Sequence, residues 1–206
     1  MEGVFRFDSK FYQAVGKAVN LIKLNVLWLL FSLPLFTIGA ANCALHASVV
    51  KVLKNQEGYI FRDFWAVFRS RFFRSLKLWI LFLLTGVGLY LDFSFWKNTG
   101  GSVAEVMLVL VGMLSFVWLL FLLYAFPLSA RMDTDTRTTL KNAGLLAFKH
   151  LPKSLYMVLW LGIAWVAGLL WAPVLLAEIF AGAAMVAAIH GKVLMKIFQK
   201  EQVPEI

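Results

Sequence analysis

The sequence predicts an all-α, polytopic membrane protein in which apolar helices form a bundle across a bilayer. Hydrophobic residues make up 61% of the 206-residue chain and charged residues only 15%, too few to give a soluble domain of this length a polar surface. Residues 107–126 include no charged side chain. At about 1.5 Å per residue this run is long enough to cross a hydrocarbon core of about 30 Å.

The first two spans, residues 18–36 and 37–53, are expected to form a short hairpin broken by Pro and Gly. One continuous helix over both would be about 54 Å long, nearly twice the thickness of the hydrocarbon core. Pro34 and Gly39 therefore mark a structural turn. Lys23 lies inside the first span, where its long side chain can reach the interface.

The other predicted spans cover residues 76–95, 103–126, 155–170 and 173–189. Six passes place 19 of the 20 Lys and Arg residues on one side and leave only Lys97 opposite, whereas five passes divide them 15 to 5. The positive-inside rule favours six passes with cytoplasmic termini, and five passes stay the alternative. We expect one integral membrane domain over residues 1–206, with a cytoplasmic N-terminal segment (1–17) and a cytoplasmic tail (190–206).

The net charge of +9 has a second possible source, a nucleic-acid-binding face. The Lys and Arg residues lie beside apolar runs instead of forming a water-exposed basic surface. We therefore expect no nucleic-acid partner and assign the charge to membrane topology.

Two cytoplasmic segments, each followed by a span, are expected to form interfacial helices. The first, at residues 61–74, carries an apolar stripe at helical spacing with arginines on the opposite face. The second, at residues 140–153, repeats parts of this pattern at an offset of 79 residues. Such a helix can be an elbow held by anionic lipid or a docking surface for a partner. The candidate partner-binding residues of the first segment are Phe61, Phe64, Trp65, Phe68, Phe72, Arg69 and Arg71.

No catalytic constellation is visible in the sequence. The three histidines, His46, His150 and His190, lie far apart, and no HExxH, Gly-rich phosphate loop or GxSxG motif occurs. The single cysteine, Cys43, excludes an internal disulfide and a cysteine-based metal site. We expect no enzymatic activity, no cofactor and no metal, and solvated positions for His150 and His190 at helix ends.

Polar residues inside apolar runs are the candidate intramembrane functional groups. Glu178 is costly in a bilayer unless it is paired or wetted, so it either reaches interfacial water or lines a cavity. His46 is either a helix-packing hydrogen bonder or a group with a ligand or proton role. Asn25 and Asn42 are expected to form interhelical hydrogen bonds that fix the packing of the hairpin.

Short motifs in and around the hairpin resemble a known family. They are FDSKF at residues 7–11, NVLW at 25–28, SLP at 32–34, TIGA at 37–40, EGY at 57–59 and TLKNA at 139–143. Together they are similar to the YesL-type family of small bacterial membrane proteins, catalogued as domain of unknown function 624. The resemblance covers nearly the whole chain and implies a location in a bacterial plasma membrane. It carries over no catalytic residue.

The same resemblance implies a function in carbohydrate utilisation, because genes of this family commonly lie beside ABC-type sugar importers and polysaccharide-degrading enzymes. It implies an accessory subunit of an ABC-type oligosaccharide importer, with the permease subunits and their ATPase as partners. One alternative is a stand-alone small transporter or channel, which Glu178 and the broken hairpin favour. A second alternative is a membrane enzyme acting on a polysaccharide or lipid-linked substrate.

Overall fold

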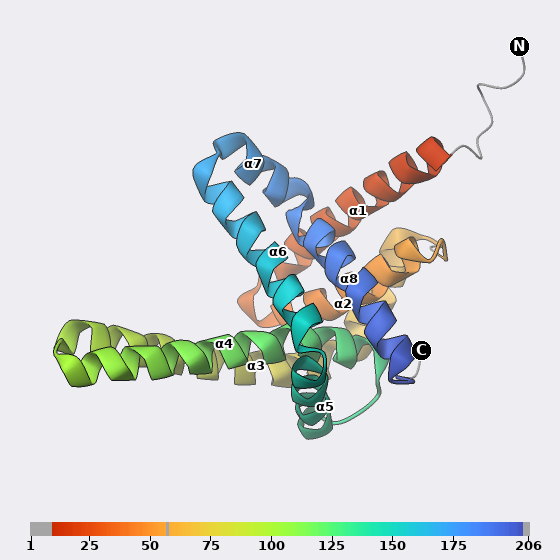
Figure 1. Ribbon diagram of the computed structural model, residues 1–206. Helices are drawn as coiled ribbons and strands as arrows, with labels where there is room; N and C mark the ends of the chain where they lie inside the picture. The colour runs from red at the N-terminus through yellow and green to blue at the C-terminus, as the bar shows by residue number, and fades with distance from the viewer. Residues whose placement is uncertain (1–9, 57, 204–206) are drawn as a thin grey trace, which may run out of the picture.

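Residues 10–56 and 58–203 are described by the computed structural model, and within them every regular element is a helix (Figure 1). In this part of the chain six helical segments are long and apolar enough to cross a membrane. The predicted all-α class and the six apolar segments are thereby confirmed. Which side of a membrane each terminus occupies stays a prediction.

The elements differ in length more than the sequence predicts. In chain order they are α1 (Lys10–Ser32), the 3-10 turn η1 (Leu35–Thr37), α2 (Ile38–Leu53), α3 (Ile60–Thr99), α4 (Ser102–Arg131), α5 (Thr136–Lys149), α6 (Leu151–Leu170), α7 (Ala172–Ala177), the π-helical turn η2 (Glu178–Gly182) and α8 (Ala183–Lys200). The expected N-terminal segment 1–17 is already helical from Lys10, and residues 1–9 lie outside the described part. The expected tail 190–206 is helical to Lys200 because α8 continues without a break.

The reversal between α1 and α2 lies at Pro34, as the sequence predicts. Pro34 is extended, with φ −76° and ψ 120°, and the Thr37 hydroxyl donates to its carbonyl at 2.6 Å. Gly39 has a different role from the one expected, since it lies in the first turn of α2, beyond the reversal. A Cβ at Gly39 would lie 2.6 Å from the Ser75 carbonyl oxygen of α3, so this glycine permits the close approach of two helix backbones.

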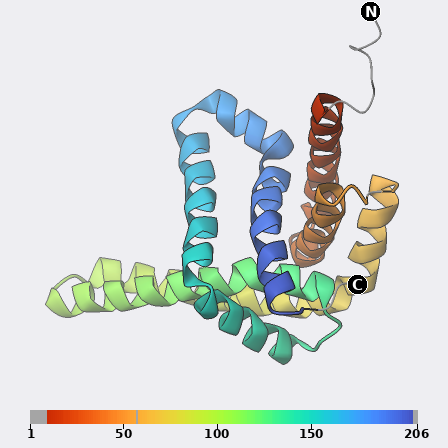
Figure 2. The ribbon, with the colours of Figure 1, turned by 45° about the vertical axis from the view of Figure 1, so that its right-hand side comes forward.

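Helix α3 is one continuous helix of 40 residues, about 60 Å long. The expected division of these residues into an interfacial helix (61–74) and a separate span (76–95) is wrong, because a single helix covers both. The stretch between Ile60 and Thr85 holds neither Pro nor Gly, so nothing ends the helix. Helix α3 instead bends, so that its first turns and the rest of the helix run in different directions (Figure 2).

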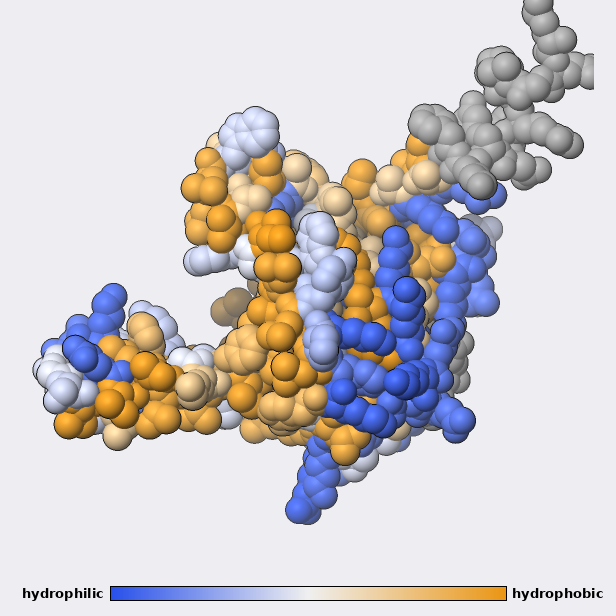
Figure 3. Space-filling view, in the orientation of Figure 1, coloured by the Kyte–Doolittle hydropathy of each residue, from blue (hydrophilic) through white to orange (hydrophobic). Residues whose placement is uncertain are grey.

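The α3–α4 hairpin extends away from the rest of the molecule, as two views agree (Figures 1 and 2). Gly100 and Gly101 form its tip with φ values of +67° and +89°, a region that favours glycine. The hairpin surface is hydrophobic except near its tip, whereas hydrophilic residues gather over the C-terminal half of α8 (Figure 3). This distribution fits a hairpin whose flanks contact lipid.

Helix α5 is a separate helix between α4 and α6, and the second predicted segment, residues 140–153, is divided at His150 between α5 and the start of α6. Its interfacial position stays a prediction. The linker before it is held by α3, because Arg71 pairs with Asp133 at 3.0 Å and Arg74 also contacts this carboxylate. The linker between α4 and α5 is thus tied to α3 through ion pairs.

Candidate functional site

A central cavity of about 520 Å³ lies among α1, α2, α4, α6, η2 and α8. Most of its lining is apolar, which suits a site inside a bilayer. Four residues add titratable or amide groups, namely Asn42, His46, Glu178 and His190. The volume falls within the range of about 300–1,000 Å³ that is typical of small-molecule sites. The structure therefore brings three of the four predicted intramembrane polar residues to one cavity.

The fourth predicted residue, Asn25, lies next to this cavity and inserts into the helix that carries Glu178. Its amide nitrogen donates to the Ile179 carbonyl at 2.8 Å, and its amide oxygen accepts from the Ala184 backbone N–H at 3.0 Å. Ile179 and Ala184 are five residues apart, the spacing of a π-helical hydrogen bond. The fully buried Asn25 side chain thus satisfies both backbone groups that the π-helical turn η2 leaves without a partner.

The π-helical turn η2 determines the position of the Glu178 side chain. Glu178 begins η2, and its carboxylate packs against Gly168 of α6, where an added Cβ would collide with Oε2. Among the described residues Glu178 has neither a hydrogen bond nor an ion pair and lines the cavity half-buried. A carboxylate in this position is expensive in a membrane, so it is the group in the cavity best placed to bind a ligand or a proton.

The two histidines of the cavity have different surroundings. His190 is buried, and its Nε2 lies 3.0 Å from the Met157 carbonyl of α6. His46 is half-buried and also lines a second cavity, which follows the C-terminal half of α2. The solvated positions expected for His150 and His190 are wrong, since the two are only 8% and 3% exposed. Glu201, just beyond α8, contacts the His150 ring, and α6 contacts the His190 ring.

Asn42 joins the two helices of the hairpin. Its side-chain oxygen accepts a hydrogen bond from the Trp28 indole at 2.8 Å. Asn42 and Trp28 both line the central cavity, so this bond fixes one of its walls.

The predicted partner-binding stripe on α3 is mostly inside the protein. Phe64 is fully buried and Phe68 is 7% exposed, because the Phe31 ring of α1 packs on both, with ring centroids 5.6 Å and 5.0 Å away. These two rings cannot anchor a partner as expected. Only Phe61 and Trp65 of the stripe remain well exposed, at 57% and 40%.

Sequence reasoning missed two features of the site. The first is His190, which the spacing of small residues on α8 could have indicated, because such residues let a neighbouring helix come close enough to bury it. The second is Gly168, whose role depends on the position of Glu178 in three dimensions. Within the described part of the chain no three His, Cys, Asp or Glu side chains lie together in a way that could hold a metal ion.

Comparison with known proteins supports the family resemblance. A family model described as "Protein of unknown function, DUF624" matches residues 21–93. The chain is also similar to the uncharacterized protein YteU of Bacillus subtilis (strain 168), with 29% identity over 138 residues, 65% of this chain and 62% of YteU. The match thus spans less than two thirds of that relative, and no solved structure matches the chain. The resemblance predicted from the hairpin motifs is confirmed for residues 21–93, which contain Asn25, Asn42 and His46, whereas the motifs at residues 7–11 and 139–143 lie outside the family-model match.

Proposed function

We propose that this integral membrane protein is a non-catalytic accessory subunit of an ABC-type oligosaccharide importer in a bacterial plasma membrane. In this proposal both termini and α5 lie in the cytoplasm, where the permease subunits and their ATPase meet. The proposal takes its substrate class from what the YesL-type resemblance implies. Its structural support comes from the exposed surface of α5.

Helix α5 exposes apolar side chains although it is not one of the candidate spans. Its 14 residues reach only about 21 Å, short of the hydrocarbon thickness. Leu145 and Phe148 are 63% and 51% exposed, and both line a shallow groove that also includes Arg137 and Lys141. Apolar anchors beside basic residues are typical of a surface that is covered by a partner or by lipid headgroups. This is the observation that carries the proposal.

Co-purification tests the partner directly. The protein is tagged at native expression level, extracted in a mild detergent and analysed by mass spectrometry. We expect permease or ATPase components with the wild type and their loss with Leu145→Ser combined with Phe148→Ser. Burying either side chain is worth about 1.5–3 kcal/mol, so the double variant should weaken binding at least about tenfold.

A matched control separates docking from a general effect of removing surface apolar groups. Tyr59 is 81% exposed and lies before α3, so Tyr59→Ser removes a similar ring elsewhere. The accessory function is refuted if no importer component is recovered with the wild type. Docking through α5 is refuted if the double variant retains the partner as well as Tyr59→Ser does.

A stand-alone transporter is the second candidate, and Glu178 favours it. An unpaired carboxylate lines the central cavity, and His46 lies between this cavity and a second one. Purified protein in liposomes should then move a labelled sugar, and Glu178→Gln should abolish this uptake. Glu105→Gln, a charge change in the first turn of α4, should leave it intact. Uptake by the isolated protein would replace the accessory proposal.

A further inference from the structure

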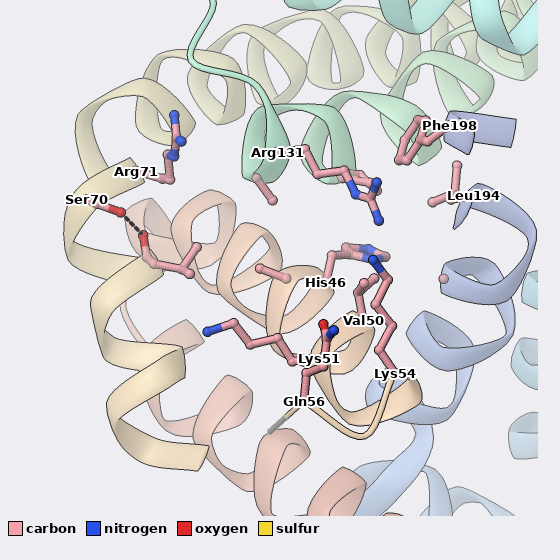
Figure 4. Close-up of a pocket in the computed structure, with 15 residues that line it drawn as sticks. His46, Val50, Lys51, Lys54, Gln56, Ser70, Arg71, Arg131, Leu194 and Phe198 are labelled. Carbon is pink, nitrogen blue, oxygen red and sulfur yellow. Dashed lines mark hydrogen bonds between the residues drawn. The ribbon is translucent and has the colours of Figure 1, made fainter. Parts of the chain in front are cut away.

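The central cavity contains one acidic side chain, Glu178, in a lining that is otherwise mostly apolar. The described residues that line it include no Lys, Arg or Asp. The cationic residues Lys51, Lys54, Arg71 and Arg131 line the second cavity instead (Figure 4). The charge of the central cavity therefore differs from that of its neighbour, and a ligand with a positive group suits it.

Two glycines leave the space in which the Glu178 side chain lies. A Cβ at Gly168 of α6 would collide with the carboxylate, and a Cβ at Gly182 would lie 2.9 Å from the Glu178 Cβ. The carboxylate is thus held beside α6 at the wall of the cavity. It has neither a hydrogen bond nor an ion pair within the part of the chain that the structure describes. An ionised carboxylate in apolar surroundings is costly until a cation pairs with it.

Aromatic rings line the same cavity from three helices. They are Trp28 of α1, Phe126 of α4 and Trp165 of α6. The faces of such rings attract cations, and aromatic side chains are a common means of binding ammonium groups. A carboxylate together with aromatic rings is therefore suited to an ammonium ion, whereas an anionic ligand would be repelled by Glu178.

The size and the opening of the cavity indicate that the ligand also has an apolar part. The volume of about 520 Å³ is far more than an ammonium group fills, and the remaining space is walled by apolar side chains. Two lining residues, Trp165 and Ile179, are 69% and 45% exposed. The cavity thus opens at the surface of α6 and η2, within a predicted span, so a molecule dissolved in the bilayer can enter it from the side.

We propose that the central cavity binds an amphiphilic amine, with the Glu178 carboxylate as the counter-ion of the ammonium group and the apolar lining around the rest of the molecule. The ammonium group can belong to a free amphiphile or to the headgroup of phosphatidylethanolamine. The recognition chemistry is the same for both sources, and the experiment separates them. This inference goes beyond the accessory function and does not depend on it, since the cavity is separate from the α5 groove.

The test measures binding of radiolabelled octylamine to the full chain in phosphatidylcholine nanodiscs by equilibrium dialysis. Empty nanodiscs give the amount that partitions into lipid alone. The pH is kept at about 8, where an alkylamine is charged as lysine is and a histidine side chain in water is neutral. We expect saturable binding of one octylamine per chain above the empty-disc level. Labelled 1-octanol, which has the same apolar body without the charge, should bind at least about tenfold more weakly.

Two glutamine variants assign the binding to the cavity. Glu178→Gln keeps the size of the side chain and removes its charge, so it should weaken octylamine binding at least about tenfold. Glu105→Gln is the matched control, because Glu105 is exposed in the first turn of α4 and does not line the cavity. This control should bind octylamine as the wild type does.

A second lipid composition identifies the source of the amine. Phosphatidylethanolamine replaces part of the phosphatidylcholine, and the octylamine titration is repeated. Weaker apparent binding of octylamine would identify the lipid headgroup as a competing occupant, and unchanged binding would identify a free amphiphile.

Two outcomes would overturn the proposal. In the first, octylamine binds to the protein no better than 1-octanol once the empty-disc level is subtracted. In the second, Glu178→Gln and Glu105→Gln bind octylamine equally well. Neither outcome bears on the recovery of importer components, so failure of this inference and failure of the accessory function are distinguishable.

Discussion

Replacing Asn25 by Leu tests whether one amide side chain stabilises the π-helical turn η2 of the last span. The substitution keeps a similar volume but removes the donor to the Ile179 carbonyl and the acceptor for the Ala184 N–H. An unsatisfied buried polar group costs about 1–3 kcal/mol, and interhelical hydrogen bonds in membranes fall toward the low end of such values. For two groups we expect a loss of about 2–4 kcal/mol, or roughly 5–15 °C in the thermal midpoint for a chain of this size.

The assay is thermal unfolding in detergent, followed by circular dichroism, with Asn42→Leu as the comparison. Asn42 accepts one hydrogen bond, from Trp28, so its variant should lose about half as much. The reasoning is refuted if Asn25→Leu unfolds at the wild-type midpoint. That result would mean that residues 178–184 return to a regular α-helix, in which the backbone satisfies itself and Asn25 is not needed.

Three further predictions follow from the fold. Gly39→Val should lower the thermal midpoint of unfolding more than Gly86→Val, because a Cβ at Gly39 meets the backbone of α3 while a Cβ at Gly86 meets a tryptophan side chain. Equal midpoints for the two variants would contradict the close approach of α2 and α3. Hydrogen bonds from lysine and histidine partners hold the pKa of Glu201 below its ordinary value, so the stabilising contribution of this carboxylate is present above about pH 4.3 and is lost as the pH falls through the lowered pKa. The Glu201→Gln variant should therefore lose less stability than the wild type on acidification, and equal losses would rule out a stabilising contribution from the Glu201 carboxylate. A cysteine at Ser9, which lies outside the described residues, should be labelled only from the cytoplasm and one at Gly100 only from outside, and external labelling of Ser9 would restore the five-pass alternative.

The spans could be predicted because each rests on local information. Runs of apolar residues fix the six helices, and Pro34 fixes the reversal between the first two. The bend of α3 could not be read in the same way, since no Pro or Gly marks it. The amphipathic stripe around Phe64 and Phe68 predicts an exposed elbow, because the pattern is the same whether lipid, a partner or Phe31 covers it.

The contacts around the central cavity could not be predicted from local patterns either, because they join residues that lie far apart in the chain. Glu178, His46 and Asn42 could each be selected as polar groups in apolar runs, yet nothing in the chain order says that they line one space. Their meeting depends on the packing of α1 and α8 and on the π-helical turn, whose open backbone groups bind the Asn25 side chain. That residue is 154 positions away from Ile179.

This separation has a consequence for how the protein is made. Asn25 enters the membrane among the first residues, but its partners are synthesised 154 residues later, roughly 10–30 s at the usual rates of translation. During this interval its amide lacks the backbone groups that satisfy it in the finished protein. The first hairpin therefore lies in the bilayer without these contacts until the last helix is synthesised and packs against it. A chain that ends before residue 184 lacks the Ala184 N–H to which the Asn25 side chain binds, and an unsatisfied buried amide costs about 1–3 kcal/mol.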